Sequence, residues 1–377
     1  MRDISVLEKI FSGELTCGQK LSLEIIRGLS ESSASRYVVP SSSAQISGVS
    51  FYNIGPEGID FLDTFAKNTR VKIKTTLNPG AFDTDNPGNH INSREVEFQK
   101  KIYSIYESMG ISLSLSCSPY FTGNLPLYGQ HISWSESSAV VFANSVLGAR
   151  TNRESGISAL SSAVTGFTPA IGLHLSKNRF SDVEIDVKDK LDDPVLFGLL
   201  GAWCGKNIPG KIPLFHMNTD KHVGVTHLQA LSASIITYGG ASMFHIEDFT
   251  PEWKDYPLPQ SSKSVTLKDL NYLWNELSDD FEYDKNTLFF TGCPHKSMED
   301  SLSIISRTNR TNFLCAGPRG SCKINNNSYM AGGCLAVSRL PDNIRKIVTD
   351  SVKAMFYLKN RGFSVKLVSA EEMDNLK

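Results

Sequence analysis

The sequence from Cys117 to Gly156 reads CSPYFTGNLPLYGQHISWSESSAVVFANSVLGARTNRESG. It follows the run Ile111 to Ser116, whose alternating apolar and polar residues predict a β-strand. Within the stretch, Ser135 to Leu147 has the length and composition of a helix, and polar loops lie on both sides of it. A strand, a loop and a helix in series are the repeating unit of an α/β fold.

The same alternation continues outward along the chain in both directions. We predict helices over Leu21 to Leu29, from Pro56 onward, and over Asp193 to Trp203. We predict strands at Val71 to Thr76, Ile212 to Phe215, Ala241 to His245 and Leu288 to Phe290. This pattern favours an α/β architecture with a largely parallel sheet. The stretch from Pro251 to Ser264 is the best candidate for a surface excursion or a boundary between lobes.

Length and composition exclude several classes of protein. The chain has 377 residues, 40% of them hydrophobic and 20% charged, which suits one large domain or two intimate ones. Its 38 Lys and Arg against 39 Asp and Glu give no basic field for nucleic acid or an anionic membrane. The longest apolar run, Pro194 to Trp203, is too short to span a membrane, and charges interrupt the N-terminal region before a secretory signal can form. We expect a cytoplasmic protein.

Chemically unusual residues come directly after several predicted strands. TTLNPG follows the strand that begins at Val71, Cys117 follows Ser116, HIED follows Phe244, and TGCPH follows Phe290. In open α/β sheets, ligands bind beyond the carboxyl ends of the strands. The spacing therefore predicts one composite site, although polar turns also follow strands without any function.

The seven cysteines contain no CxxC pair, so a zinc ribbon is not expected. In a reducing compartment, such scattered cysteines are free, metal-bound or catalytic. Cys117, Cys293 and Cys334 lie beside glycine or proline, which stiffen a loop or let it turn sharply. The other four have less distinctive neighbours and are interpreted as small buried hydrophobes: Cys17, Cys204, Cys315 and Cys322.

Three cysteines in rigid loops would bind three irons of a [4Fe-4S] cluster and leave the fourth iron open to substrate. An open iron acts as a Lewis acid that stabilises a departing hydroxide, which is the chemistry of a dehydratase. A protein base must then remove a neighbouring proton. The candidates are His295, His245 and Glu247, although a lone histidine is more often a structural hydrogen-bonding group.

Two further groups suit an anionic substrate. Arg150 and Arg153 each present a fork that binds a carboxylate or phosphate, or else satisfy carbonyls at the end of a helix. The glycine of Gly48 to Ser50 lets backbone donors approach an anion, and Asn78 with Pro79 could close the other side.

Taken together, these segments resemble the aconitase X family over nearly the whole chain. The segments of this chain that carry the resemblance are QISGVSFYNIG (45–55), KTTLNPG (74–80), the stretch 117–156, GLHLSKNR (172–179), ASMFHIEDFTPE (241–252), TGCPHKS (291–297) and GCLAVSRL (333–340). The resemblance implies an aconitase-like catalytic large subunit over 1–377, with a cluster on Cys117, Cys293 and Cys334. It also implies substrate contacts at Gly48, Val49, Ser50, Asn78 and Pro79.

The family further implies a hydro-lyase that works as a heterodimer, because the small swivelling domain is absent from this chain. Archaeal members resemble phosphomevalonate dehydratases of a modified mevalonate pathway, which convert (R)-5-phosphomevalonate to trans-anhydromevalonate 5-phosphate. Bacterial members include cis-3-hydroxy-L-proline dehydratases. The segments 151–166 and 172–179 are more similar to the archaeal type, so phosphomevalonate is the expected substrate.

The sequence departs from the family pattern at two places. Gln45 stands where many members have histidine, and the interval from Cys293 to Cys334 is shorter than usual. Cys315 and Cys322 are therefore alternative third ligands. An inactive metal-binding or regulatory relative is the alternative of another functional class.

Overall fold

The computed structural model describes residues 1–218, 223–320 and 328–376. Cys322, one of the alternative third ligands, lies outside these residues. The described residues form four sheets, three parallel and one antiparallel, with helices packed around them. The predicted α/β class with largely parallel sheets is therefore confirmed. No described helix is long and apolar enough to cross a membrane.

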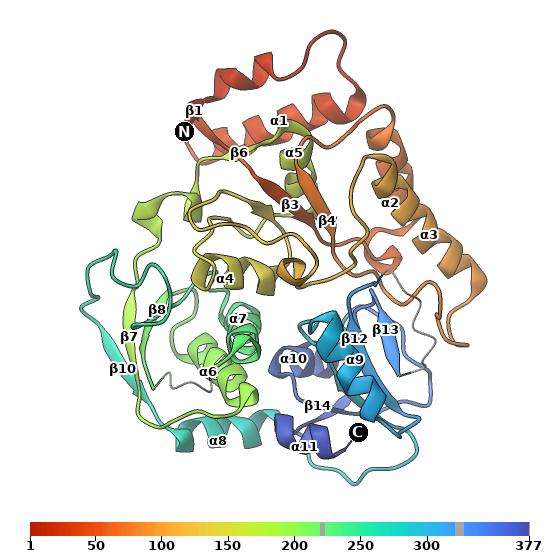
Figure 1. The fold of residues 1–377 in the computed structure, drawn as a ribbon, viewed down its shortest axis with the longest axis vertical. Helices are drawn as coiled ribbons and strands as arrows, with labels where there is room; N and C mark the ends of the chain where they lie inside the picture. Colours follow the sequence, from red (N-terminus) through yellow and green to blue (C-terminus); the bar gives the residue numbers. More distant parts are fainter. Residues whose placement is uncertain (219–222, 321–327, 377) are drawn as a thin grey trace.

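The first parallel sheet lies in the upper part of Figure 1, among helices from the N-terminal half of the chain. Its strands, in order, are β4 (Lys74–Leu77), β3 (Ser43–Ile46) and β5 (Ser133–Trp134). The helices around it are α1 (Cys17–Ser32), α2 (Phe51–Ala66), α3 (Ser93–Ser108) and α5 (Gly156–Thr165). Their apolar faces share a core with β3 and β4, which fixes the register of the sheet and of the loops at its carboxyl edge.

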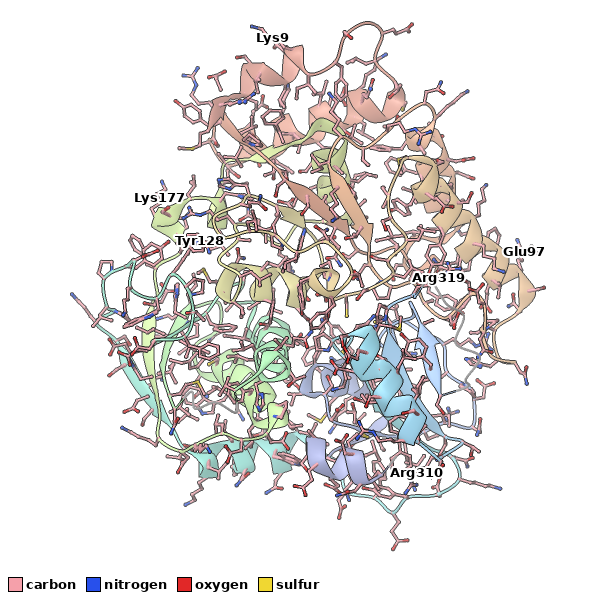
Figure 2. All side chains as sticks on the ribbon, viewed as in Figure 1. Lys9, Glu97, Tyr128, Lys177, Arg310 and Arg319 are labelled. Atoms are coloured by element: carbon pink, nitrogen blue, oxygen red, sulfur yellow. The ribbon has the colours of Figure 1, made fainter. Side chains whose placement is uncertain are left out.

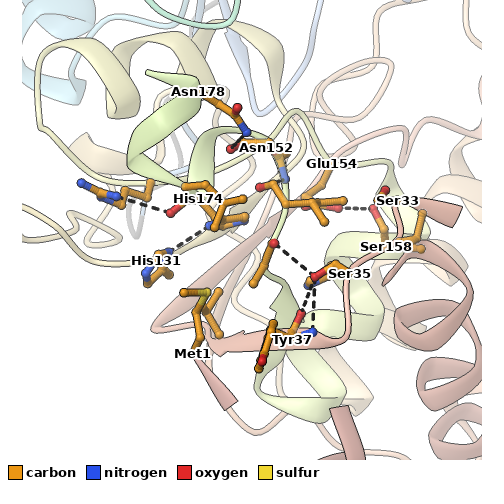
Figure 3. A pocket seen from close by; sticks show the side chains of 18 of the residues that line it. Met1, Ser33, Ser35, Tyr37, His131, Asn152, Glu154, Ser158, His174 and Asn178 are labelled. Atoms are coloured by element: carbon orange, nitrogen blue, oxygen red, sulfur yellow. Dashed lines mark hydrogen bonds between the residues drawn. The ribbon is translucent and has the colours of Figure 1, made fainter. Parts of the chain in front are cut away.

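A small antiparallel sheet, β1 (Arg2–Asp3), β2 (Tyr37–Pro40) and β6 (Phe167–Pro169), lies beside this first unit. Short 3-10 helices accompany it: η1 (Ile4–Lys9), η3 (Gly172–His174) and η4 (Ser176–Asn178). Tyr37, His131 and His174 lie around a cavity at this sheet (Figure 3).

Two further parallel sheets lie side by side in the lower half of Figure 1. One has the order β10 (Ser262–Val265), β7 (Val183–Val187), β8 (Pro213–His216), β9 (His245–Ile246). The other has the order β13 (Tyr329–Ala331), β12 (Phe313–Gly317), β11 (Thr287–Thr291), β14 (Lys346–Thr349), β15 (Ser364–Leu367). Charged side chains such as Lys9, Glu97 and Arg310 lie at the periphery of the molecule (Figure 2).

Helices fill the space around these two sheets and join them into one core. They are α4 (Ser137–Ser145), α6 (Pro194–Asn207), α7 (Val225–Gly239), α8 (Leu267–Leu277), α9 (Met298–Arg307), α10 (Val352–Asn360) and α11 (Ala370–Asn375). Glycines on α6 let α7 approach closely: a Cβ at Gly201 would lie 2.7 Å from the Ile235 nitrogen, and one at Gly205 2.5 Å from the Tyr238 carbonyl carbon. Larger residues there would push the two helices apart.

Most predicted elements are present, with some corrected boundaries. The helices predicted at Leu21, Ser135 and Asp193 correspond to α1, α4 and α6. α2 has a kink at Gly55, with φ +61°, so Pro56 begins its second segment as predicted. The strand predicted from Val71 begins only at Lys74.

Two predicted strands are largely wrong. Residues 111–116 make one isolated bridge, between Ser112 and Thr76, because Leu115 has a φ of +43° that breaks the extended conformation. Of the predicted strand Ala241 to His245, only His245 is in a strand, β9. In both cases the apolar residues are mostly buried, but the backbone has few strand partners.

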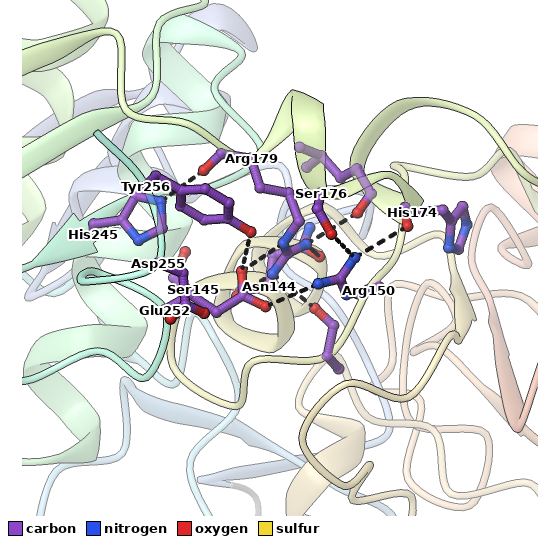
Figure 4. A network of polar contacts seen from close by, with 12 residues as sticks. Asn144, Ser145, Arg150, His174, Ser176, Arg179, His245, Glu252, Asp255 and Tyr256 are labelled. Carbon is purple, nitrogen blue, oxygen red and sulfur yellow. Dashed lines mark hydrogen bonds and ion pairs between the residues drawn. The ribbon is translucent and has the colours of Figure 1, made fainter. Parts of the chain in front are cut away.

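A buried arginine joins the loop after α4 to the loops after η3 and β9 (Figure 4). The Arg179 side chain is fully buried, and its Nε lies 2.6 Å from Glu252 Oε2. Its remaining nitrogens donate to the Asn144 side chain and to the carbonyls of Asn144, Ala149 and Leu173, at 3.0–3.1 Å. Because every guanidinium nitrogen is hydrogen-bonded, the desolvation cost of the charge is offset.

Replacing Arg179 with Met is expected to lower the free energy of unfolding by about 3–5 kcal/mol, because the buried Glu252 would lose its nearer cation and keep only Arg150, 3.7 Å away. Lys188→Met, which breaks the half-exposed pair with Asp186, should cost less than about 1 kcal/mol. Urea unfolding followed by circular dichroism measures both changes. Equal small losses would contradict a stabilising role for the Arg179 network.

Candidate active site

Three loops that carry cysteines meet at the carboxyl edges of β4 and β11. The backbone N–H of His295 donates to Cys117 Sγ at 3.1 Å, and His295 Nε2 lies 3.0 Å from the Gly333 carbonyl. The Ser118 hydroxyl donates to the His295 carbonyl at 2.8 Å. His295 thus links the loop of Cys117 to the loops of Cys293 and Cys334, as the prediction of a shared site requires.

The loop of Cys334 is also bound to the end of β4. The N–H of Gly80 donates to the Gly332 carbonyl at 3.0 Å, and the N–H of Cys334 donates to the Gly80 carbonyl at 3.1 Å. A Cβ at Gly80 would lie 2.0 Å from the Tyr103 hydroxyl, so only glycine fits at this contact. The structure therefore brings Cys334 to the predicted site. Cys315 instead lies in the apolar core around β12.

The three thiols are surrounded by many protein atoms, although each residue keeps part of its surface exposed. Burial, and then the Glu136 carboxylate, raise the pKa of Cys117 far above its ordinary value. Burial raises the pKa of Cys293 to about 12, although Lys353 opposes the shift, and burial also raises the pKa of Cys334. The thiols are protonated at neutral pH, so they must release their protons when a metal binds to the sulfurs.

The charges near these thiols come from an ion pair that the sequence did not indicate. Lys353 Nζ lies 2.8 Å from Glu136 Oε1, and both side chains are about nine-tenths buried. Burial alone would lower the pKa of Lys353, but Glu136 and the nearby Cys293 and Cys117 raise it. A lysine within the apolar run VKAMFYL was the available signal, because a buried lysine needs a partner.

The spacing of the three cysteines can be compared with what a metal centre requires. Among residues 1–218, 223–320 and 328–376, no three His, Cys, Asp or Glu side chains are grouped closely enough to bind one metal ion. Cysteines that bind a cluster each bond a different iron, so they are spaced more widely than ligands of one ion. Three enclosed thiols on backbone-linked loops fit that requirement.

The predicted substrate residues lie at the same edge of the first sheet. Gly48 is exposed with a φ of +75°, and Ser50 is the N-cap of α2, accepting from the Tyr52 N–H. Val49 is fully buried in the core and fixes the loop in place. The N–H of Asn78 donates to the Ile46 carbonyl at 2.9 Å, which holds Asn78 and Pro79 beside that loop. The N–H groups at the start of α2 already have partners: that of Phe51 donates to the Gln99 side chain, that of Tyr52 to the Ser50 hydroxyl, and those of Asn53 and Ile54 to the Ser50 carbonyl. The anion-binding prediction therefore rests on the backbone of Gly48 to Ser50.

Gln45 connects these substrate residues to the Cys117 loop. Its Nε2 donates to the Ser116 carbonyl at 3.0 Å and to Asn78 Oδ1 at 3.2 Å. A carbonyl oxygen can only accept, so the orientation of the Gln45 amide is fixed. Asn78 must then accept through Oδ1, which leaves its Nδ2 as a donor for a ligand. Gln45 is fully buried and its Oε1 has no partner, so it can accept from a ligand as well.

The structure does not bring the HIED segment to the cysteines. His245 Nε2 hydrogen-bonds the Arg179 carbonyl at 2.9 Å, and Glu247 pairs with His216 Nδ1 at 2.7 Å beside β8. Asp248 is exposed beside Lys254. Of the three candidate bases, only His295 lies at the cysteine loops. The sequence pattern failed here because HIED follows a strand of a different sheet.

Arg150 and Arg153 also lie elsewhere. They line the cavity of Figure 3, whose described lining contains none of the three cysteines and none of residues 48–50, 78 and 79. Arg150 is held by Ser176 at 2.8 Å and by Glu252 at 3.7 Å. The prediction that this pair binds a carboxylate or phosphate group of the substrate beside the cluster does not agree with this arrangement.

Comparison with known proteins agrees with this geometry. Residues 6–177 match the aconitase X first domain, and residues 181–281 match the aconitase X second domain. The chain belongs to the aconitase X family, which confirms the resemblance seen in the sequence.

Individual relatives differ in their identity to this chain and in how much of it they match. The phosphomevalonate dehydratase large subunit of Thermococcus kodakarensis is 33% identical over 97% of each chain. The crystal structure of Thermococcus kodakaraensis aconitase X in its holo-form superposes with a TM-score of 0.86, at 32% identity over 99% of each chain. The cis-3-hydroxy-L-proline dehydratase of Pseudomonas aeruginosa is 29% identical over 83% of this chain and 54% of its own length.

The buried pair beside the thiols can be tested by a double-mutant cycle. Lys353→Met should lower the free energy of unfolding by about 3–5 kcal/mol, because it leaves the Glu136 carboxylate buried without its cation. Adding Glu136→Gln to this variant should restore part of that loss, measured by urea unfolding. If the effects of the two substitutions simply add, the two groups are not coupled as described.

Proposed function

We propose that this chain is the large subunit of a phosphomevalonate dehydratase, a hydro-lyase that converts (R)-5-phosphomevalonate to trans-anhydromevalonate 5-phosphate. The observation that carries the proposal is the end-to-end likeness to a protein of that name, over 97% of both chains. Four further proteins with the same name are 30–36% identical to this chain. The hydroxyproline enzyme matches over only about half of its length, so it is the second candidate.

The proposed cofactor is a [4Fe-4S] cluster on Cys117, Cys293 and Cys334. When bound, it would supply a Lewis acid that stabilises the departing hydroxide. The chain's own contribution is to hold the three thiols in fixed positions through His295 and Gly80 and to place Lys353 near the anionic sulfurs. Chain residues that enclose the thiols also limit the access of water to them.

The proposed substrate site is the edge formed by Gly48, Val49, Ser50, Asn78 and Pro79. The backbone of Gly48 to Ser50 would bind one anionic group of the substrate, and Asn78 Nδ2 would donate to an oxygen beside it. With Arg150 and Arg153 in another cavity, these groups carry most of this chain's anion recognition in the proposal. The second anionic group would require donors from the partner subunit.

His295 is better suited to holding the loops than to removing a proton. Because the Gly333 carbonyl can only accept, Nε2 carries the ring hydrogen and Nδ1 keeps its lone pair. Nδ1 is buried without a partner, so a lone pair is available. Burial lowers the pKa of His295 to about 4, however, which makes it a weak base near neutral pH.

The partner in this proposal is a separate small subunit. The relatives that match end to end are named large subunits, and a substrate edge open to one side leaves room for a second chain to complete it. Closing such a site excludes water and supplies further contacts. The alternative of another class, an inactive relative, would keep the fold without needing the cluster or the partner.

Substrate choice is tested with the reconstituted two-subunit enzyme under anaerobic conditions. Turnover of (R)-5-phosphomevalonate should exceed that of cis-3-hydroxy-L-proline by at least about 100-fold, because the proposed site would bind an acyclic substrate with two anionic groups. Asn78→Ala should raise KM by about tenfold or more, through the loss of a charge-assisted hydrogen bond. Faster hydroxyproline turnover, or full activity from this chain alone, would contradict the proposal.

The cluster ligands are tested by iron and sulfide analysis after anaerobic reconstitution. Cys117→Ala, Cys293→Ala and Cys334→Ala should each lose most of the cluster and its visible absorbance, because each removes a thiolate from an iron. Cys204→Ala and Cys315→Ala are matched controls in the apolar core and should keep the cluster. If Cys334→Ala keeps the cluster and Cys315→Ala loses it, the third ligand is misassigned.

A further inference from the structure

A cavity of about 1290 Å³ lies between the antiparallel sheet, the loop 150–155 and the short helices η3 and η4 (Figure 3). It is a separate feature from the candidate active site, because the two share no described lining residue. The His131–Arg150 bridge lies at the amino end of β5, and the lining continues along this strand to Glu154, whose N–H donates to the Trp134 carbonyl at 3.1 Å.

The cavity concentrates positive charge, although the chain as a whole has a net charge close to zero. Four cationic side chains line it, Arg36, Arg150, Arg153 and Lys177, against the single carboxylate of Glu154. The whole chain, in contrast, has 38 cationic and 39 anionic residues. Such a local excess of one charge raises the concentration of ligands of the opposite charge.

Two of these cations are available to a ligand. Arg153 and Lys177 make no hydrogen bond or ion pair with any residue in the described part of the chain, although Arg150 is oriented by Ser176 and Glu252. Lys177 lies at the surface (Figure 2), and Arg153 is exposed within the lining. An oriented guanidinium beside two free cations is the arrangement that binds phosphate groups.

The cavity also holds a buried polar group that lacks a partner. His131 Nδ1 and His174 Nδ1 lie 3.0 Å apart, so one donates and the other accepts (Figure 3). His174 is only 2% exposed, and its Nε2 has no hydrogen-bond partner in either tautomer. Buried polar atoms in this state usually have a ligand or ordered water as a partner.

We propose that this cavity binds a second ligand, a small phosphorylated or other polyanionic metabolite distinct from the substrate. Arg153 and Lys177 bind its anionic groups beside the guanidinium of Arg150, whose Nη1 and Nη2 stay on Ser176 and Glu252, and the His131–His174 pair contacts its polar part. The volume suits a metabolite of drug size or somewhat larger. The inference does not depend on the identity of the substrate.

The cavity has a physical route to the substrate edge. Its lining includes Ser155, the N-cap of α5, and the next residue, Gly156, packs against the Ser47 carbonyl. A Cβ at Gly156 would lie 2.5 Å from that oxygen, so the start of α5 packs directly against Ser47. Ser47 immediately precedes Gly48, and ligand binding would therefore restrain the loop that we assign to the substrate.

The binding test uses inorganic pyrophosphate and isothermal titration calorimetry on the full chain at low salt. One equivalent should bind, and the double variant Arg153→Gln/Lys177→Gln should weaken binding by at least about tenfold. The matched control Arg70→Gln/Lys20→Gln removes the same charges from exposed positions outside the cavity and should change Kd by less than about twofold. Asn78→Ala should leave pyrophosphate binding unchanged.

Three results would overturn the proposal. No binding at millimolar pyrophosphate would show that the cavity lacks an anion site. Loss of binding in Asn78→Ala, but not in the cavity variant, would place the anion at the substrate edge. Displacement of bound pyrophosphate by the purified small subunit would show that this face docks the partner. Retention of binding in the heterodimer, in contrast, supports a metabolite site. Turnover of phosphomevalonate by the reconstituted enzyme is measured separately. A cavity that binds no pyrophosphate therefore overturns this proposal without overturning the proposed function.

Discussion

The site depends on one requirement: three thiols from loops far apart in the chain must be held together before any cofactor binds. The His295 N–H on Cys117 Sγ and the His295 ring on the Gly333 carbonyl meet this requirement across two sheets. Gly80 adds the end of β4 through two backbone hydrogen bonds. Because these contacts join backbone groups to one another or to the buried His295 ring and the Cys117 sulfur, the loops keep their positions without relying on long flexible side chains, and the substrate edge is fixed to the same frame.

Burial gives this arrangement its chemical character. It raises the pKa values of the three thiols, and it makes the Lys353–Glu136 pair costly to separate. Removing solvent strengthens the electrostatic interactions that remain. The second cavity differs in this respect, because two of its cations, Arg153 and Lys177, are exposed and would be available to the anion that we propose. One chain thus separates an enclosed thiol site from an open cationic site.

The sequence predicted those parts of the structure that depend on local pattern. Strand–loop–helix alternation gave the α/β class, and glycine and proline beside Cys117, Cys293 and Cys334 identified loops that the fold does bring together. It could not reveal contacts between distant positions: Lys353 and Glu136 are 217 residues apart. The pattern misled for HIED, Arg150 and Arg153, because a single sequence does not tell which sheet a strand joins or which edge a following loop occupies.

The central claim is that three cysteines of this chain hold a cluster with one iron open to phosphomevalonate. Mössbauer spectroscopy of the two-subunit protein, reconstituted anaerobically with ⁵⁷Fe, tests it most directly. The account predicts four irons, one of which changes its isomer shift and quadrupole splitting when (R)-5-phosphomevalonate is added while three stay unchanged. A spectrum that does not respond to this substrate, or a cluster whose irons all have thiolate ligands, would contradict it.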